Sequence, residues 1–202
     1  MIPWTDNVRQ SGKLMIYMGT LAGSWGHVLR EAIRDFNVLS SAHKLGVAIT
    51  ESKHAPDDTA GANVSVQTAS GPISASYDNQ TLSENFDGGR LHGRTFLFWR
   101  DPGNVVEKAF IYLPSQPRVN TPKGQRPVGA GVMKVIAAHE LLHACGLEDA
   151  DHSSGLFQAN PRVNAGDSAA GDKVLIGTGP KSMPPLVLDG VTAKNIKDLW
   201  AK

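Results

Sequence analysis

The sequence predicts an α/β or α+β domain in which a twisted sheet packs against helices. Three observations favour this class: apolar segments of strand length, amphipathic segments of helical periodicity, and a loop-rich stretch before a final helix. The chain has 202 residues, of which 41% are hydrophobic, which is enough for one domain with its own core. We expect a single domain over residues 1–202, with an upper lobe over about 1–146 and a lower lobe over about 147–202.

Strands and one long helix are expected first. Residues 14–18 form a short apolar run, which predicts a buried strand. Ser24 is the expected N-cap of a following helix. The apolar residues of that helix share one face: Trp25, Leu29, Ile33 and Phe36. Residues 46–52 predict a second strand, and residues 63–69, where valine alternates with polar residues, predict a half-buried third.

The middle of the chain adds two further strands. Residues 78–93 are polar and glycine-rich and predict a long surface loop. The aromatic segment 95–99 and the continuously apolar segment 109–113 predict strands, the second of them central in the sheet. Prolines between residues 114 and 127 predict an irregular connection.

Residues 131–145 predict the clearest helix, which Gly146 is expected to end. The apolar residues of this helix keep helical spacing: Val132, Val135, Ile136, Leu142 and Cys145. Residues 148–181 are loop-rich, and a final helix is expected from a cap at Thr192. Its apolar face holds Ile196, Leu199 and Trp200.

Charge and cysteine content exclude several classes of protein. The chain carries 20 Lys and Arg against 19 Asp and Glu, which argues against a dedicated nucleic-acid or membrane-surface binder. The single cysteine, Cys145, excludes a disulfide-stapled scaffold and is expected in the core. The first residues lack the pattern of a signal peptide, so we expect either an intracellular protein or the mature form of an exported one.

The strongest functional signal is His139, Glu140 and His143, inside the clearest helix. Their spacing places both imidazoles on one face, where they can bind one zinc ion at about 2.0–2.1 Å. Glu140 can accept a proton from metal-activated water and pass it to a leaving amine. The alternative is a chance match on an exposed helix. This helix is otherwise apolar, however, and burying these groups without partners would cost on the order of several kcal/mol, which a metal removes.

A catalytic zinc site needs a third protein ligand and an open fourth position. Gly146 would let the chain turn back beneath the metal, and the first suitable groups after that turn are Asp149 and His152. We favour His152, because imidazole is the more usual zinc ligand, and keep Asp149 as the alternative.

The His-Glu-x-x-His-x-x-Gly pattern of residues 139–146 resembles the zinc signature of the metzincin metalloproteases. By the register of that signature the third ligand falls on Asp149, as in the snapalysin-type variant. His152 followed by serine instead resembles the matrixin form, delayed by three residues. Met183, in a Lys-Ser-Met-Pro-Pro sequence, resembles the methionine turn that lies beneath the zinc in this family.

The resemblance implies a matrixin-like fold: a twisted, mostly parallel five-stranded sheet with an antiparallel edge strand, a long zinc-site helix, and a small loop-rich C-terminal lobe ending in a helix. It also implies one catalytic zinc ion, and no motif indicates calcium. Segment 95–99 would be the edge strand above the cleft, and residues 184–188 would form one wall of the substrate pocket.

The implied activity is that of a zinc-dependent endopeptidase, a monomeric hydrolase in which Glu140 is the general base for zinc-activated water. A peptide or protein substrate would lie antiparallel to the edge strand. The alternative is a non-catalytic, zinc-containing module that binds peptide or is structural; Glu140 favours catalysis, because a structural site does not need it. The remaining histidines are expected at the surface: His27, His43, His54 and His92.

Overall fold

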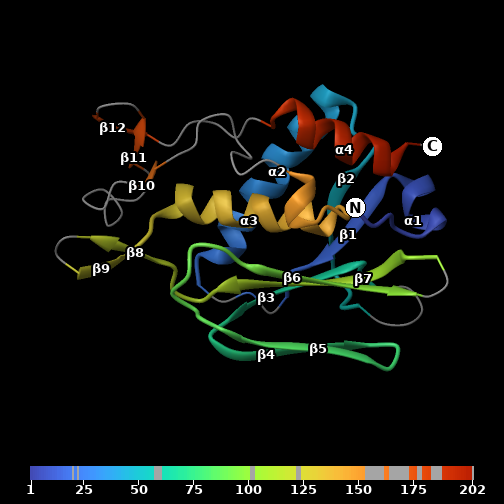
Figure 1. Cartoon of the computed structure of the whole chain (residues 1–202), viewed down its shortest axis with the longest axis horizontal. Coiled ribbons are helices and arrows are strands. Elements are labelled where there is room, and N and C mark those ends of the chain that lie inside the picture. Colours follow the sequence, from blue (N-terminus) through green and yellow to red (C-terminus); the bar gives the residue numbers. More distant parts are fainter. Residues whose placement is uncertain are drawn as a thin grey trace.

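A five-stranded sheet lies at the centre of the computed structural model (Figure 1). Across the sheet the strands are β2 (Ala48–Ser52), β1 (Lys13–Tyr17), β3 (Val64–Ala69), β7 (Val105–Pro114) and β6 (Arg94–Arg100). The first four run parallel to their neighbours, whereas β6 is antiparallel to β7 at the edge. The expected mostly parallel sheet with an antiparallel edge strand is confirmed. The structure describes residues 1–19, 21, 23–56, 61–100, 103–121, 124–152, 162–163, 173–176, 179–182 and 188–201.

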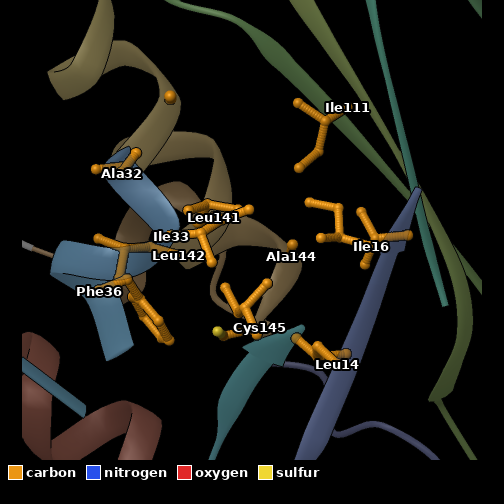
Figure 2. Packing of buried hydrophobic residues seen from close by; sticks show 14 of the residues in the cluster. Leu14, Ile16, Ala32, Ile33, Phe36, Ile111, Leu141, Leu142, Ala144 and Cys145 are labelled. Carbon is orange, nitrogen blue, oxygen red and sulfur yellow. The ribbon is translucent and has the colours of Figure 1, made fainter. Parts of the chain in front are cut away.

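Two long helices pack side by side on one face of this sheet. Helix α2 (Trp25–His43) carries the chain from β1 to β2, because parallel strands cannot be joined by a hairpin. Helix α3 (Ala130–Ala144) lies against it and is buried on most sides, which explains its nearly continuous apolar sequence. Figure 2 shows the core between both helices and the sheet, formed by Leu14, Ile16, Ile33, Phe36, Ile111, Leu141, Leu142 and Cys145.

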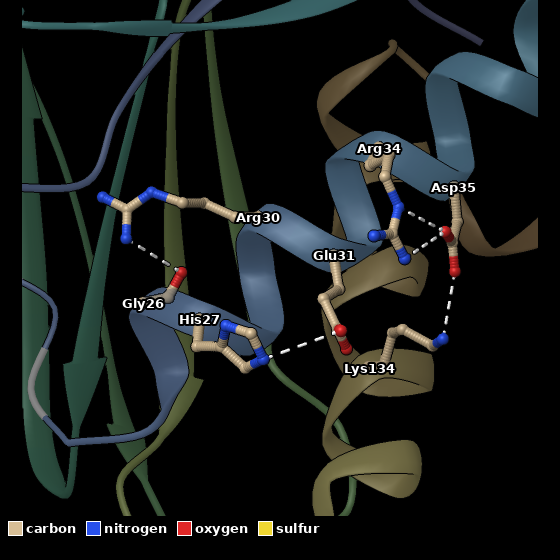
Figure 3. Close-up of polar contacts among 7 residues, drawn as sticks. All are labelled: Gly26, His27, Arg30, Glu31, Arg34, Asp35 and Lys134. Atoms are coloured by element: carbon tan, nitrogen blue, oxygen red, sulfur yellow. Dashed lines mark hydrogen bonds and ion pairs between the residues drawn. The ribbon is translucent and has the colours of Figure 1, made fainter.

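Polar contacts also join α2 to α3 (Figure 3). Lys134 Nζ on α3 lies 3.0 Å from Asp35 Oδ2 on α2 and joins the two helices. Within α2, Arg34 Nη2 lies 3.3 Å from Asp35 Oδ1. Such partly exposed pairs contribute at most about 1 kcal/mol each, so they orient the helices more than they stabilise the fold. His27, at the start of α2, is exposed and pairs with Glu31, as expected for a surface histidine.

The opposite face of the sheet is covered by a hairpin that the sequence analysis did not predict. Strands β4 (Gly71–Tyr77) and β5 (Gln80–Phe86) are joined by a turn in which Asp78 and Asn79 have positive φ. The surface loop expected over residues 78–93 is therefore wrong for its first half. One face of β5 meets solvent, and the resulting polar alternation reads as a loop in the sequence. A second apolar cluster lies beneath the hairpin: Ile73, Ala75, Phe86, Phe96, Phe98 and Tyr112.

Three shorter elements also correct the sequence analysis. Helix α1 (Asp6–Ser11) precedes β1 and has no buried residue, so no hydrophobic pattern marks it. The irregular connection expected after β7 contains a hairpin of β8 (Arg118–Thr121) and β9 (Gly124–Pro127). Pro127 is tolerated at the end of β9, because a proline nitrogen at the end of an edge strand removes no bond from the interior of a sheet.

The final helix, α4 (Gly190–Trp200), is present, but Asp189 rather than Thr192 caps it. The Asp189 carboxylate accepts hydrogen bonds from the backbone N–H groups of Val191 and Thr192 at 3.0 Å each. Thr192 lies inside the helix with its side chain buried. Sequence spacing alone did not separate these two capping residue types.

Between α3 and α4 the structure describes a short 3-10 turn, η1 (Asp149–Asp151), and three strands. The strands form an antiparallel sheet in the order β10 (Arg162–Val163), β11 (Lys173–Ile176) and β12 (Gly179–Ser182). Met183 and residues 184–187 lie outside the described residues, so the expected methionine turn and pocket wall stay predictions. Leu188, the last residue of that wall, is buried in the main core. None of the described helices is long and apolar enough to cross a membrane.

Candidate metal centre

The C-terminal part of α3 carries two histidines of the predicted site. His139 and His143 lie one helical turn apart, with their Nε2 atoms 2.9 Å from each other and their ring centroids 4.7 Å apart. Helix α3 ends immediately afterwards, at Ala144, and Gly146 follows with a φ of +102°. A side chain at this position would meet the carbonyl oxygen of Ile2 at 2.2 Å, so both the backbone conformation and the space require glycine.

The chain then turns back and brings both candidate third ligands to the same place. The His152 ring lies 5.0 Å from the rings of His139 and His143, and the three rings are steeply inclined to one another. Asp149 Oδ1 lies 3.4 Å from His143 Nε2. One ligand atom from each of the four residues lies within 4.8 Å of the others, so this cluster can hold a metal ion.

The imidazoles of α3 are in the protonation state that metal binding requires. Burial, reinforced by the neighbouring histidines, lowers the pKa of His139 to about 3. Burial likewise lowers the pKa of His143. His143 Nδ1 lies 2.8 Å from the carbonyl oxygen of Leu147, and a carbonyl accepts only from a protonated nitrogen. The Nε2 atom of neutral His143 therefore keeps its lone pair and faces the cluster. Metal-binding histidines are commonly fixed in this tautomer by a hydrogen bond from the other ring nitrogen to a carbonyl oxygen.

The donor set fits a divalent transition metal. Imidazole nitrogens suit zinc, copper, iron and nickel, and a carboxylate is an accepted additional ligand. Two nitrogens at about 2.0–2.1 Å from one tetrahedral zinc ion lie roughly 3.3 Å apart, close to the 2.9 Å between the α3 nitrogens. His152 approaches with its Nε2 atom buried from solvent, whereas the Asp149 side chain is 89% exposed.

Glu140 lies beside the cluster and is buried against strand β6. The Thr95 hydroxyl donates a hydrogen bond to Glu140 Oε2 at 2.7 Å, and the backbone of Gly93 provides another. Burial raises the pKa of Glu140 to about 7, although both hydrogen bonds oppose the rise. The carboxyl group is thus held in one place with a pKa near neutral pH.

Close approach to Glu140 also explains a glycine that the sequence analysis did not single out. A Cβ atom on Gly93 would lie 2.6 Å from Glu140 Cγ and 2.7 Å from the carbonyl oxygen of Tyr112. Gly93 therefore lets the start of β6 pack directly on the carboxylate. Neither Gly93 nor Thr95 carries a recognisable motif, because their importance depends on contacts between distant parts of the chain.

The cluster opens into a cleft of about 780 Å³ between α3, β5 and β6. Strand β6 pairs with β7 on one side, and no described strand pairs with its other edge. The polar lining of the cleft includes residues that the sequence analysis missed or assigned to the surface: Glu84, Arg90, His92 and Arg94. Glu84 pairs with both Arg90 and Arg94, at 3.4 and 2.9 Å. The apolar lining includes Leu82, Leu97 and Trp99.

The other sequence expectations about reactive residues are mostly met. Cys145 is fully buried in the core, and burial raises the pKa of its thiol, so it is no nucleophile. His43 and His54 are exposed, and His92 is exposed but lies at the cleft. Met183 is outside the described residues, so its expected position near the cluster is untested.

In comparisons with known proteins, no family model and no curated protein sequence matches the chain. The interpretation of this site therefore rests on its own geometry: a mixed α/β fold with a His/Asp cluster that can hold a metal ion.

Proposed function

We propose that the protein is a zinc-dependent endopeptidase of the metzincin type. The observation that carries this proposal is the convergence of His139, His143 and His152 on one point. The first two of these histidines line an open cleft together with the buried Glu140. Three histidines leave a fourth position of a tetrahedral ion open, as catalytic zinc sites require. A bound zinc ion would supply Lewis acidity toward a peptide carbonyl and would lower the pKa of water in the site.

Glu140 would be the general base in this reaction. Its pKa of about 7 lies near the value at which a base is most efficient at neutral pH. The positive charge of a bound ion would oppose the rise in pKa that burial causes and would favour the ionised carboxylate. Thr95 and Gly93 fix the carboxylate, so that it would accept a proton from water without a search for the correct rotamer. The same carboxyl group would then deliver the proton to the leaving amine.

Strand β6 would bind the substrate. This strand lines one wall of the cleft, and no strand in the described part of the chain pairs with its outer edge. An extended peptide can add to such an edge through backbone hydrogen bonds. Backbone pairing would hold a peptide chain in register across the metal centre with little dependence on its side chains. This arrangement favours an internal peptide bond as the substrate.

The test compares three proteins loaded with zinc and incubated with a mixture of unstructured peptides analysed by mass spectrometry. The wild-type protein should cleave peptides, and a chelator should stop the cleavage. Glu140→Gln should retain zinc but lose about 10²- to 10⁴-fold in rate, the usual contribution of a general base. Glu31→Gln, on α2 and outside the residues that line the cleft, is the control and should cleave at the wild-type rate.

Two outcomes would contradict the proposal. Cleavage by Glu140→Gln at the wild-type rate would exclude the role of Glu140. A wild-type protein that binds one zinc ion but cleaves no peptide would instead support the alternative, a zinc-containing module that binds peptide or is structural.

A further inference from the structure

The segment that carries the third ligand needs support from outside itself. His152 follows a 3-10 turn of only three residues, in which no residue is buried. A turn this short contributes little stability of its own, because few hydrogen bonds offset the cost of ordering it. The position of the His152 ring must therefore depend on contacts that this segment makes with the rest of the fold.

Helix α4 provides such a contact. Asn195 Nδ2 donates a hydrogen bond to the carbonyl oxygen of Asp151 at 2.6 Å, in a half-buried environment. This carbonyl belongs to the planar peptide group that joins Asp151 to His152. Fixing its oxygen fixes the whole plane, including the nitrogen of His152, and so restricts the direction of the His152 side chain.

Helix α4 is itself attached to the end of the helix that carries the other two ligands. The indole N–H of Trp200 donates to the carbonyl oxygen of Cys145 at 3.0 Å, at the C-terminus of α3. Ile196 and Leu199 of α4 are buried in the main core. Asn195 thus connects the His152 segment to an element whose distance from His139 and His143 is fixed by packing.

The Asp151 side chain is held by different partners. Its carboxylate accepts from the backbone N–H of Glu148 at 2.9 Å and pairs with the α-amino group of Met1 at 2.7 Å. Those contacts act on the carboxylate, whereas Asn195 acts on the peptide group next to His152. The two kinds of contact can therefore be separated by mutation.

We propose that Asn195 is a positioning residue for the metal centre, which holds the His152 imidazole in the place where it completes the ligand set. This role rests on the proposed metal binding but does not depend on peptidase activity. It also implies that His152, rather than Asp149, is the third protein ligand.

The experiment is a double-mutant cycle read out by zinc affinity, measured by competition with a chromophoric chelator. Asn195→Asp keeps the shape of the side chain but replaces the donor by a carboxylate that repels the Asp151 carbonyl. It should weaken zinc binding about 10- to 100-fold in the wild-type background, which is the usual effect of losing a hydrogen bond that orients a metal ligand. In a His152→Ala background the same change should have less than about a 3-fold effect, because the ligand it positions is gone.

Two further variants keep the test decisive. Lys197→Ala, on the exposed face of the same helix, should leave zinc affinity unchanged and controls for changes in α4. Asn195→Ala removes the donor without adding charge and should show the same loss of zinc affinity. This variant decides the question if Asn195→Asp does not fold. The absorption spectrum of the cobalt-substituted protein should change with both Asn195 variants and not with Lys197→Ala.

Several results would overturn the role of Asn195. An equal loss of affinity with and without His152 would mean that Asn195 supports the fold in general. Unchanged affinity in the wild-type background would mean that it positions nothing. A loss that disappears in an Asp149→Ala background instead would identify Asp149 as the ligand. Because the readout is metal affinity, a protein that binds zinc and cleaves no peptide still decides the question.

Discussion

At the scale of single residues, the site depends on how a buried carboxyl group is held. Glu140 combines two opposing influences: burial raises its pKa, and the hydrogen bonds from Thr95 and Gly93 lower it. The net pKa of about 7 leaves the group able both to accept and to release a proton near neutral pH. Its neighbours therefore set the protonation of Glu140 as much as they set its position.

The Thr95 hydrogen bond gives a prediction about pH dependence. Because this bond favours the ionised carboxylate, Thr95→Val should raise the pKa of Glu140 by about one unit. A general base works in its deprotonated form, so the acidic limb of the kcat/KM profile should move to higher pH by the same amount. Thr95→Ser keeps the hydroxyl and should follow the wild-type profile. Superimposable profiles for Thr95→Val and the wild-type protein would contradict this role of Thr95.

At the scale of secondary-structure elements, the packing of β6 on α3 places Glu140. The start of the strand approaches the helix so closely that only glycine fits at position 93. At the other edge of the sheet, in β2, the backbone of Ile49 has a side-chain partner. The Asn37 amide exchanges two hydrogen bonds of 2.8 Å with it, as a neighbouring strand would. This contact occupies the backbone groups of Ile49 on edge strand β2, whereas no described strand pairs with the outer edge of β6.

This close packing predicts the effect of adding one methyl group. Gly93→Ala should lower the free energy of unfolding by about 1–3 kcal/mol, because the new Cβ atom overlaps Glu140 and the Tyr112 carbonyl group. Gly190→Ala is the matched control: a Cβ atom there meets no atom within 4 Å. That variant should be neutral or stabilised by up to about 1 kcal/mol. Urea denaturation of both variants checks this, and equal midpoints would show that β6 does not pack tightly on Glu140.

At the scale of the whole molecule, the metal centre couples the fold to metal and to pH. The pKa of His139 is about 3 in the metal-free fold, against 6.5 for an unperturbed histidine. Between these values the unfolded chain binds more protons at His139 than the folded chain. The contribution of His139 to the stability of the metal-free protein should therefore fall as the pH falls below 6.5, against an opposite contribution from Glu140, whose pKa is raised to about 7. Above that pH the contribution of His139 should be constant.

Unfolding experiments at several pH values test this coupling. In His139→Gln, which cannot be protonated, the free energy of unfolding of the metal-free protein should fall less steeply below about pH 6.5 than in the wild-type protein. Zinc at about 100 times its dissociation constant should stabilise the wild-type fold by about 2.7 kcal/mol near neutral pH. An unchanged pH slope in His139→Gln would show that His139 is not buried as a neutral group.

The sequence predicted the parts of this molecule that depend on local pattern. The five central strands, α2 and α3 follow from apolar periodicity, and His139, Glu140 and His143 follow from spacing within one helix. The hairpin of β4 and β5 was missed because its exposed face is polar and its apolar residues are few. Thr95 and Asn195 were missed because each acts across at least 44 residues of sequence, through contacts that no local pattern encodes.

The ligand environment of bound zinc tests the central claim most directly. X-ray absorption at the zinc edge of the protein loaded with one equivalent of metal should show three imidazole nitrogens at about 2.0–2.1 Å and a fourth ligand that is not an imidazole. His152→Ala should reduce the imidazole count by one, whereas Asp149→Ala should leave it unchanged. Failure to bind zinc, or a spectrum without imidazole ligands, would contradict the assignment of this cluster as a metal centre.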